Sequence, residues 1–257
     1  MTSEQIVSRL LYRDGLMLVI DKPAGIAVHR GPNGGESLED AFDALRFGLP
    51  RQPALAHRLD RDTSGCLVLG RHRKALAQLG KLFKSGAIAK TYWAVVEGAP
   101  EEEDGVIELP LGRLDVTRGW WMKHDPGGQP AATRWRVLGR AANEPGAQRT
   151  WLALEPLTGR THQLRVHCAE MGWPILGDAI YGNAPRQGGP PLHLHARAIA
   201  VPLYKNRAPI RVTAPVPPHM RAALAQCGWK AEREEALGEH AGRIASSHEP
   251  SEAAPSS

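Results

Sequence analysis

The segment His57–Gly65, "HRLDRDTSG", places two aspartates, each beside an arginine, directly before the apolar run Cys66–Leu69. That run has the composition of a buried strand. A carboxylate at the edge of a core is costly unless a cation pairs with it, so we expect Asp60 to have an arginine partner. An ionised, fixed carboxylate can act as a nucleophile or a base. The alternative is a solvated loop of weak surface ion pairs. The following residues, Asp62–Gly65, are predicted to shape the turn.

A second polar cluster lies in "LTGRTHQLRVH", Leu157–His167. Four basic side chains surround the predicted start of a helix there: Arg160, His162, Arg165 and His167. This pattern fits either an amphipathic helix with a basic face or an anion site, because free amides at a helix start favour phosphate or carboxylate. The two histidines are five residues apart, which does not match the i, i+4 spacing of zinc ligands on a helix.

Two further groups of polar residues lie in predicted strands. Two-residue alternation in Ile88–Glu97 puts Lys90 and Tyr92 on one face and Trp93 on the other. Tyr92 fits a plain core position, or a surface on which a base stacks. His193 and His195 share a face of their strand, as some zinc ligand pairs do, but no third ligand is evident. Buried histidines with backbone partners are the simpler interpretation.

The elements that position these residues are mostly strands. Alternating or short apolar runs predict strands at Leu16–Ile20, Ile26–His29, Cys66–Leu69, Ile88–Glu97, Val106–Leu109, Thr133–Leu138, Thr150–Leu154 and Leu192–Val201. Three helices are predicted: one capped by Ser37 with Leu38, Ala41, Phe42 and Leu45 on one face, one through Leu76–Phe83 ending near Gly86, and one capped by Thr161 with Leu164, Cys168 and Met171 as its stripe. Strands do not alternate regularly with helices. We therefore predict an α+β fold with one large mixed, mostly antiparallel sheet.

Charge and cysteine usage narrow the class of protein. The net charge of +5 divides into about +8 before Lys230 and −3 from there onward. A basic body favours a polyanion such as nucleic acid. The three cysteines are far apart and suit neither a disulfide framework nor a zinc cluster, so we expect a reducing compartment. With no apolar run of membrane-spanning length and no secretory signal, the expected location is the cytoplasm. Residues 231–257, rich in Ala, Glu, Ser and Pro, predict a frayed helix and a disordered tail.

Taken together, these motifs resemble the RluA family of RNA pseudouridine synthases. "HRLDRDTSG" is similar to the family's catalytic motif, "KTY" at Lys90–Tyr92 to its lysine–x–tyrosine motif, and "LTGRTHQLRVH" to its arginine motif. Supporting matches are "DKPAGIAVH" at Asp21–His29, "ILGDAIYG" at Ile175–Gly182 and "LHLHA" at Leu192–Ala196. The resemblance implies a catalytic domain over residues 1–230 with an active cleft across the middle of its sheet. It resembles the short subgroup without an added RNA-binding domain, which modifies a stem-loop of transfer RNA, large-subunit ribosomal RNA or both.

The resemblance also implies roles for individual residues. Asp60 is the essential carboxylate, either attacking the anomeric carbon or assisting glycal formation. Arg165 pairs with Asp60, and Tyr92 stacks on the uracil. Arg58 fills the space that the flipped base vacates, while Arg160, Lys90 and His162 contact substrate. The isomerisation needs no cofactor or metal, and we expect a monomer that binds RNA and no membrane.

Two alternatives remain open on the sequence alone. A non-catalytic RNA-binding module explains the basic charge and Tyr92, but not an arginine–aspartate pair placed where a cleft is expected, because acidic groups repel phosphate. A zinc hydrolase would use His193, His195 and an aspartate.

Overall fold

The computed structural model describes residues 1–31, 34–115, 120–141 and 148–231. Helices are α1 (Ser3–Val7), the 3-10 helix η1 (Leu38–Leu45), α2 (Arg73–Lys84), α3 (Gln163–Glu170) and α4 (Pro218–Gln226). Strands are β1 (Leu10–Arg13), β2 (Met17–Lys22), β3 (Ala54–Leu55), β4 (Ser64–Gly70), β5 (Ala89–Glu97), β6 (Asp104–Glu108), β7 (Leu111–Arg113), β8 (Met122–His124), β9 (Ala132–Arg140), β10 (Arg149–Pro156), β11 (Leu194–Val201) and β12 (Ile210–Thr213). The predicted tail at 231–257 lies outside the described residues, apart from its first residue.

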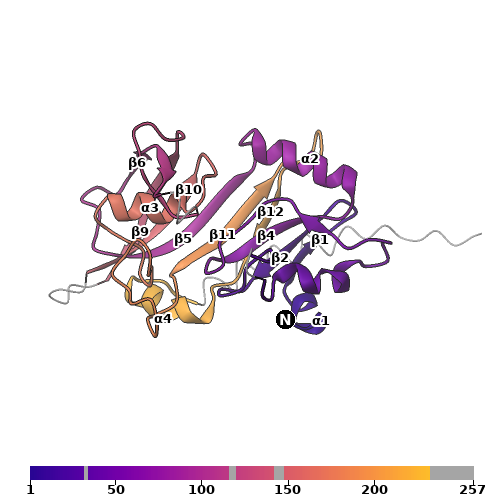
Figure 1. Ribbon diagram of the computed structural model, residues 1–257, viewed down its shortest axis with the longest axis horizontal. Coiled ribbons are helices and arrows are strands. Elements are labelled where there is room, and N and C mark those ends of the chain that lie inside the picture. Colours follow the sequence, from indigo (N-terminus) through magenta and orange to yellow (C-terminus); the bar gives the residue numbers. More distant parts are fainter. Residues whose placement is uncertain (32–33, 116–119, 142–147, 232–257) are drawn as a thin grey trace, which may run out of the picture.

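One large sheet runs through the whole molecule (Figure 1). Its strand order is β1-β2-β4-β11-β5-β10-β9-β6, with β12 paired to β11 and β3 paired to β4. Within the described chain all of its strand pairs are antiparallel except β4 with β11. The predicted α+β class with a mixed, mostly antiparallel sheet is therefore confirmed.

Apolar alternation on the central strands explains why the sheet is covered on both faces. On β4, Leu67 and Leu69 face one core while Cys66 and Val68 face another. On β5, Tyr92 and Ala94 pack on one face and Trp93 and Val95 on the other, as predicted. Helices cover these faces, with α2 above the sheet and α4 below it in Figure 1. Because both faces are buried, each strand has a fixed register.

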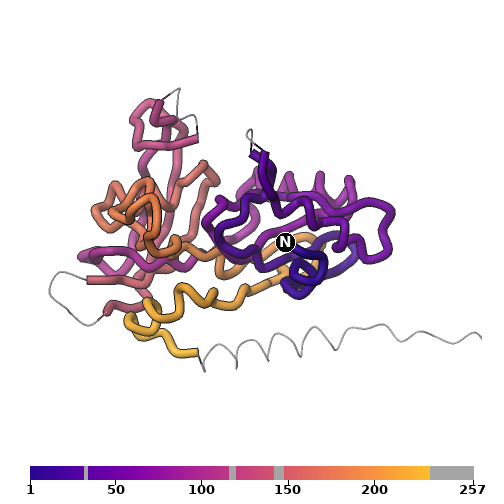
Figure 2. Tube along the Cα trace, turned by 60° about the horizontal axis from the view of Figure 1, so that its bottom comes forward, coloured from indigo at the N-terminus to yellow at the C-terminus, as the bar shows by residue number. Residues whose placement is uncertain are grey.

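The chain builds the two ends of the sheet in sequence and then returns to its middle. Figure 2 shows the N-terminal segments on one side, the middle of the chain on the other, and the orange trace of β11 running back between them. There β11 pairs with β4 in parallel and with β5 in antiparallel fashion. Residues 131 positions apart in the sequence, Ser64 and His195, therefore meet at the centre of the sheet.

Three local predictions are wrong. Ile26–His29 is not a strand, because it makes only an isolated bridge between Ala27 and Ser37. Thr161 does not cap α3; His162 is the cap residue, in the left-handed conformation with φ of 52°. Met171 is exposed rather than part of the apolar stripe, because α3 ends at Glu170. The helices predicted from Ser37 and from Leu76–Phe83 are confirmed as η1 and α2, with η1 wound as a 3-10 helix.

Candidate active site

The loop between β3 and β4 carries Asp60, and a buried lysine fixes its backbone. The Nζ of Lys22, at the end of β2, donates to the carbonyl oxygens of Pro23, Arg61 and Thr63, each at 2.8 Å. The Lys22 side chain is fully buried. Burial lowers its pKa to about 8, against the opposing effect of Asp62, Asp60 and Asp21. Lys22 therefore connects the sheet directly to both sides of the turn after Asp60.

The other end of the loop is fastened to β11. Ser64 Oγ lies 2.9 Å from His195 Nδ1, and Gly65 pairs with Ala196. Gly65 has φ of +103°, and a Cβ there would overlap the Ala196 backbone, so only glycine fits. The predicted turn is present, and the Thr63 amide closes it by donating to the Asp60 carbonyl at 3.2 Å. The backbone rather than the side chains closes it, since the Asp62 and Ser64 side chains contact Arg61 and His195.

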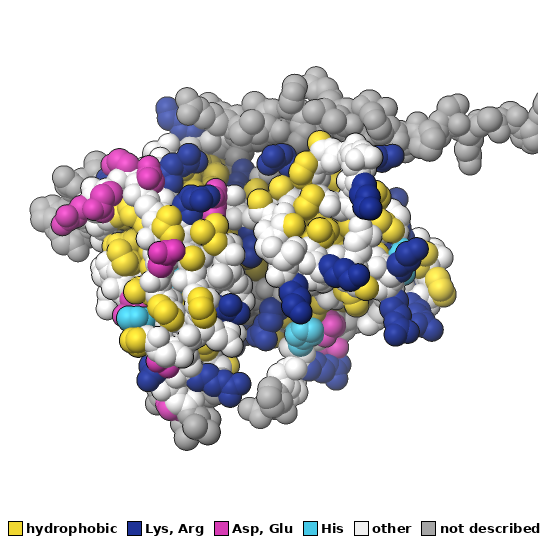
Figure 3. Space-filling view, turned by 90° about the horizontal axis from the view of Figure 1, so that it is seen from above, with side chains coloured by type: hydrophobic (Ala, Val, Ile, Leu, Met, Phe, Trp, Pro, Cys, Tyr) yellow, Lys and Arg dark blue, Asp and Glu magenta, His cyan; other side chains and the backbone are white. Residues whose placement is uncertain are grey.

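A cavity of about 850 Å³ opens beside this loop, and all seven site residues predicted from the sequence line it. They are Arg58, Asp60, Lys90, Tyr92, Arg160, His162 and Arg165. Seen from above, a hollow lies between the two halves of the molecule, with Lys and Arg side chains in it and across the half that carries α2 (Figure 3). The structure therefore brings together three sequence segments that are far apart in the chain.

The predicted ion pair between Arg165 and Asp60 is wrong. Arg165 Nε and Nη2 each donate to Asp178 at 2.7 Å, and both side chains are buried, being 5% and 1% exposed. Burial alone would lower the pKa of Arg165, but the hydrogen bonds and charge of Asp178 raise it. The charges of Arg165 and Asp60 still interact across the cavity. Asp178 takes the guanidinium because it lies in the turn that faces the first residues of α3.

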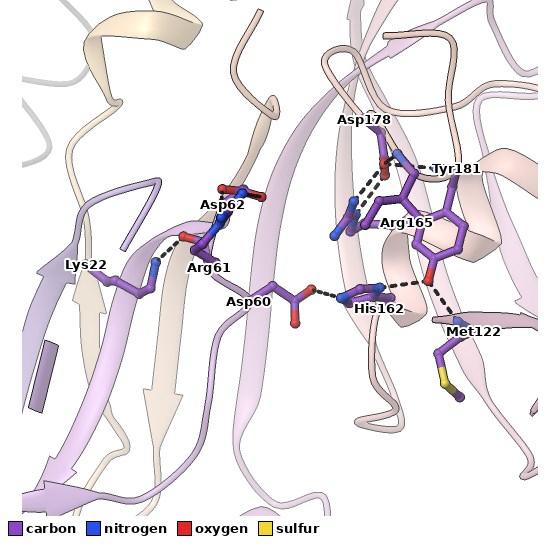
Figure 4. A network of polar contacts seen from close by, with 10 residues as sticks. Lys22, Asp60, Arg61, Asp62, Met122, His162, Arg165, Asp178 and Tyr181 are labelled. Carbon is purple, nitrogen blue, oxygen red and sulfur yellow. Dashed lines mark hydrogen bonds and ion pairs between the residues drawn. The ribbon is translucent and has the colours of Figure 1, made fainter. Parts of the chain in front are cut away.

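Among the described residues, His162 is the one cationic or histidine side chain within 4.0 Å of the Asp60 carboxylate. Its Nε2 lies 3.8 Å from Asp60 Oδ2, while its Nδ1 lies 2.7 Å from the Tyr181 hydroxyl (Figure 4). The Tyr181 hydroxyl also accepts a hydrogen bond from the Met122 amide at 2.9 Å. Burial lowers the pKa of His162, although the charge of Asp60 opposes this. His162 is therefore a neutral ring at pH 7, between the aspartate and a tyrosine.

The remaining predicted residues form the walls and rim of the cavity. Burial raises the pKa of Tyr92, so its hydroxyl stays protonated. Burial lowers the pKa of Lys90, which is half-buried on the same face of β5. Arg58 is exposed, as is Arg160, whose Nε donates to the Pro130 carbonyl at 3.0 Å. Tyr92 and Lys90 therefore line the cavity from β5, and Arg58 and Arg160 add exposed cations to its lining.

The other histidines singled out in the sequence have structural contacts. His193 Nδ1 lies 2.8 Å from the Pro191 carbonyl, and His195 Nε2 lies 3.4 Å from that of Ala214. His167 contacts Thr133 and Leu109, which removes it from the predicted basic cluster. Within the described ranges, no three His, Cys, Asp or Glu side chains group as metal ligands. The simpler interpretation of His193 and His195, buried rings with backbone partners, is confirmed.

Four residues of the site were not predicted: Lys22, Asp178, Tyr181 and Trp120. The first three lie in "DKPAGIAVH" and "ILGDAIYG", which matched the family without a role for either segment. Trp120 is 58% exposed and meets the His162 ring edge-on, with centroids 5.5 Å apart. Exposure is a property of the folded chain, so nothing in the sequence alone singled out Trp120.

Comparison with known proteins gives a consistent answer. A family model described as RNA pseudouridylate synthase matches residues 16–170. An uncharacterized RNA pseudouridine synthase of Zymomonas mobilis is 41% identical over 214 residues, covering 82% of this chain and 95% of that protein. Ribosomal large subunit pseudouridine synthase C of Vibrio cholerae is 36% identical over 224 residues, covering 84% and 68%. The structure of human RNA pseudouridylate synthase domain containing 4 matches with a TM-score of 0.71 and 26% identity, covering 88% of this chain and 95% of that one.

Proposed function

The chain belongs to the RNA pseudouridylate synthase family, and from this premise we propose that Asp60 is the carboxylate on which its isomerisation of uridine in RNA depends. The enzyme breaks the bond between ribose and the uracil nitrogen, turns the base, and rejoins it through carbon. The observation that carries the proposal is the placement of Asp60, half-buried on a fixed loop, in a cavity that also holds Tyr92, His162 and Arg165.

Each side chain of the cavity has a role in this proposal. Asp60 acts on the anomeric carbon, as a nucleophile or as a stabiliser of glycal formation. Tyr92 stacks on the uracil and, since its raised pKa keeps the hydroxyl protonated, it serves as a proton donor rather than a base. Arg165, fixed by Asp178, supplies positive charge near Asp60 without binding it.

The exposed cations act on the RNA itself. Extruding the target base costs a few kcal/mol, and less in a loop than in a duplex. Arg58, two residues before Asp60, fills the vacated space, since a guanidinium can stack and contact phosphate together. Arg160 and Lys90 contact phosphate, and Trp120, whose ring meets that of His162, offers an exposed surface on which a neighbouring base stacks.

The basic surface extends the RNA contact beyond the cavity. Four exposed cations lie on α2, at the top of the molecule in Figure 1, and the last of them lines the cavity: Arg73, Lys74, Lys81 and Lys84. They are placed to meet the phosphates of a stem that enters the cleft. We propose a stem-loop of large-subunit ribosomal RNA or transfer RNA as the substrate, bound by residues 1–230 acting as a cytoplasmic monomer. The ribosomal choice is supported by the name of the Vibrio cholerae relative. In the part of the chain that the structure describes, no helix has the length and apolarity needed to cross a bilayer.

The substitution Asp60→Asn tests the central assignment. Asparagine has nearly the same size but no charge, so we expect tritium release from RNA carrying 5-tritiated uridine to fall below detection while RNA affinity changes little. Asp62→Asn is the matched control, because Asp62 lies in the same turn and pairs with the exposed Arg61. We expect this control to keep near-normal turnover. Normal turnover by Asp60→Asn would refute the assignment.

A further inference from the structure

His162 is held between Asp60 and Tyr181 by its backbone as well as its ring. It has φ of 52°, a left-handed conformation that histidine adopts more readily than most residues. Its carbonyl oxygen accepts from the Val166 amide at 3.0 Å, in the first turn of α3. Only 7% of its side chain is exposed. The direction of each ring nitrogen is therefore fixed by the start of the helix.

The hydrogen bonds of Tyr181 determine which ring nitrogen carries the proton. The Tyr181 oxygen accepts from the Met122 amide at 2.9 Å, and its one hydroxyl proton is free to donate to His162 Nδ1 at 2.7 Å. In the opposite tautomer Nδ1 would donate to Tyr181, and the lone pair of Nε2 would face the Asp60 carboxylate at 3.8 Å. That arrangement sets two electron-rich atoms against each other. The network favours the proton on Nε2.

We propose that His162 is a positioning residue for Asp60, and that Tyr181 fixes it as the tautomer whose neutral Nε2–H points at the aspartate (Figure 4). The chain of donors runs from the Met122 amide to Tyr181, from Tyr181 to His162, and from His162 toward Asp60. This inference rests on the proposed role of Asp60 in the reaction.

A neutral donor suits this place better than a cation. A histidinium or a free guanidinium at the same distance would hold the carboxylate as an ion pair and reduce its capacity to attack or stabilise the sugar. Arg165 is prevented from doing so because two of its nitrogens bind Asp178. The charged groups that act on His162 are Asp60, Asp178, Arg165 and Arg58, of which the carboxylates favour its cation and the arginines oppose it. Burial decides the balance in favour of the neutral ring.

One turn organises both groups that face Asp60. The Oδ1 of Asp178 accepts from the amides of Ile180 and Tyr181 at 2.9 and 3.1 Å, so the carboxylate that holds Arg165 also fixes the backbone of Tyr181. The Met122 amide adds the hairpin of β7 and β8 to the same network. The groups that face Asp60 are therefore held by two segments that are far apart in the sequence, the turn at Asp178–Tyr181 and the hairpin of β7 and β8.

A spectroscopic experiment tests the tautomer directly. Protein labelled with 15N-histidine is examined at pH 7.5, and the ring signals of His162 are identified among the 11 histidines by their loss in His162→Gln. We expect Nε2 to be protonated and Nδ1 unprotonated in the wild type, and the Tyr181→Phe variant to lose this preference. A protonated Nδ1 in the wild type, or an unchanged ring in Tyr181→Phe, would overturn the proposal.

Kinetics tests whether the tautomer matters to the reaction. In Tyr181→Phe we expect kcat to fall on the order of 10- to 100-fold, the scale on which a small misplacement of a reacting group lowers rates, with KM for RNA changed less than about two-fold. Because Nδ1 is then free to take a proton, the acid limb of the kcat profile should move up by about one pH unit. His162→Gln, whose amide can donate near the Nε2 position, should keep about ten-fold more activity than His162→Asn, whose shorter amide cannot.

The control is Tyr204→Phe, which removes a hydroxyl that donates to Asp14 far from the cavity. We expect its kcat and pH profile to match the wild type. If Tyr181→Phe behaves like this control, the proposal fails. It also fails if the melting temperature and kcat fall together in Tyr181→Phe and both His162 variants while the acid limb of the pH profile stays in place. That pattern would indicate a structural role. Normal turnover by Asp60→Asn would refute the proposed function instead, while the tautomer would still be read from the labelled ring.

Discussion

Arg165 and Asp178 form a buried bidentate ion pair, and Asp60 lies beside it without joining it. A buried pair of this kind contributes little net stability compared with apolar side chains, but the loss of one partner leaves an uncompensated charge. The pair therefore acts mainly to keep the guanidinium in one place. The position of the guanidinium determines the electrostatic potential at Asp60, and the carboxylate of Asp178 also fixes the turn that carries Tyr181.

The substitution Asp178→Asn should destabilise the protein strongly. We expect the free energy of unfolding to fall by about 3–5 kcal/mol, because Arg165 remains buried and charged without its carboxylate. Urea denaturation at pH 7.5 measures the change. Asp43→Asn is the control, since Asp43 pairs with Arg46 on the surface and should change stability little. A loss below about 1 kcal/mol in Asp178→Asn would contradict the assignment of a buried pair.

Seven residues that line the cavity could be predicted from the sequence, but their pairings and four further residues of the site could not. These seven residues were identified because the composition and order of their motifs match a family, and such a match can be made without knowing the structure. The partner of Arg165 could not be found in this way, because Asp60 and Asp178 are both carboxylates within reach in a folded chain. Only the backbone of the Asp178 turn, with its amides bound to the same carboxylate, decides between them. Tyr181 was missed for the same reason, since its proposed role depends on the position of its hydroxyl group beside His162 Nδ1 in the folded chain.

At the scale of elements, the loop that carries Asp60 is held at several points by neighbouring strands. Lys22 at the end of β2 binds its carbonyl oxygens, and Ser64 and Gly65 attach it to β11. A reacting group must be fixed in this way if it is to meet a flipped base without large losses in rate. The motifs "DKPAG" and "LHLHA" thus contribute to the site by holding the loop that carries Asp60.

The substitution Lys22→Met should separate the loop from β2. We expect the free energy of unfolding to fall by about 3 kcal/mol or more, since each buried carbonyl that loses its donor costs about 1–3 kcal/mol. Turnover should fall roughly 100-fold because Asp60 is no longer fixed. Lys81→Met, on the exposed side of α2, is the matched control and should leave stability unchanged. Full activity in a folded Lys22→Met variant would show that the loop holds its shape without this lysine.

The elements that the sequence predicted correctly are those with strong periodicity. β4, β5, β9 and β10 have apolar residues at alternate positions or buried on both faces, which is what sheet pairing requires. Ile26–His29 has the same composition, yet it pairs only through an isolated bridge between Ala27 and Ser37, so composition alone did not identify a strand there. α4 was missed because its start, Pro217 and Pro218, resembles a loop, although proline is well suited to a first helical turn.

At the scale of the whole molecule, the two halves of the sheet are joined at its centre by β11. β11 returns there to pair with β4, β5 and β12, and His195 lies at the junction with no exposed surface. Its Nδ1 faces the Ser64 hydroxyl and its Nε2 faces the Ala214 carbonyl beyond β12. Strand order of this kind cannot be read from periodicity, because alternation identifies a strand without naming its neighbours. The mixed class was predictable, while the parallel pairing of β4 with β11 was not.

This central histidine should make the fold sensitive to acid. Burial lowers the pKa of His195 to about 4, whereas an unfolded histidine titrates near 6.5. Between these values the unfolded chain binds the extra proton, so stability is full above pH 6.5 and falls as the pH drops toward 4. At pH 5 this one group should contribute a loss of about 2 kcal/mol.

The substitution His195→Gln isolates that contribution. Glutamine does not titrate, and its amide can still donate to a carbonyl near Ala214. We expect the free energy of unfolding to fall between pH 7.5 and pH 5.0 by about 2 kcal/mol less in His195→Gln than in the wild type, as measured by urea denaturation at each pH. His29→Gln, at an exposed position, should lose as much as the wild type. Equal losses in wild type and His195→Gln would mean that the ring takes up its proton without disturbing the junction, so that acid sensitivity must arise from other groups.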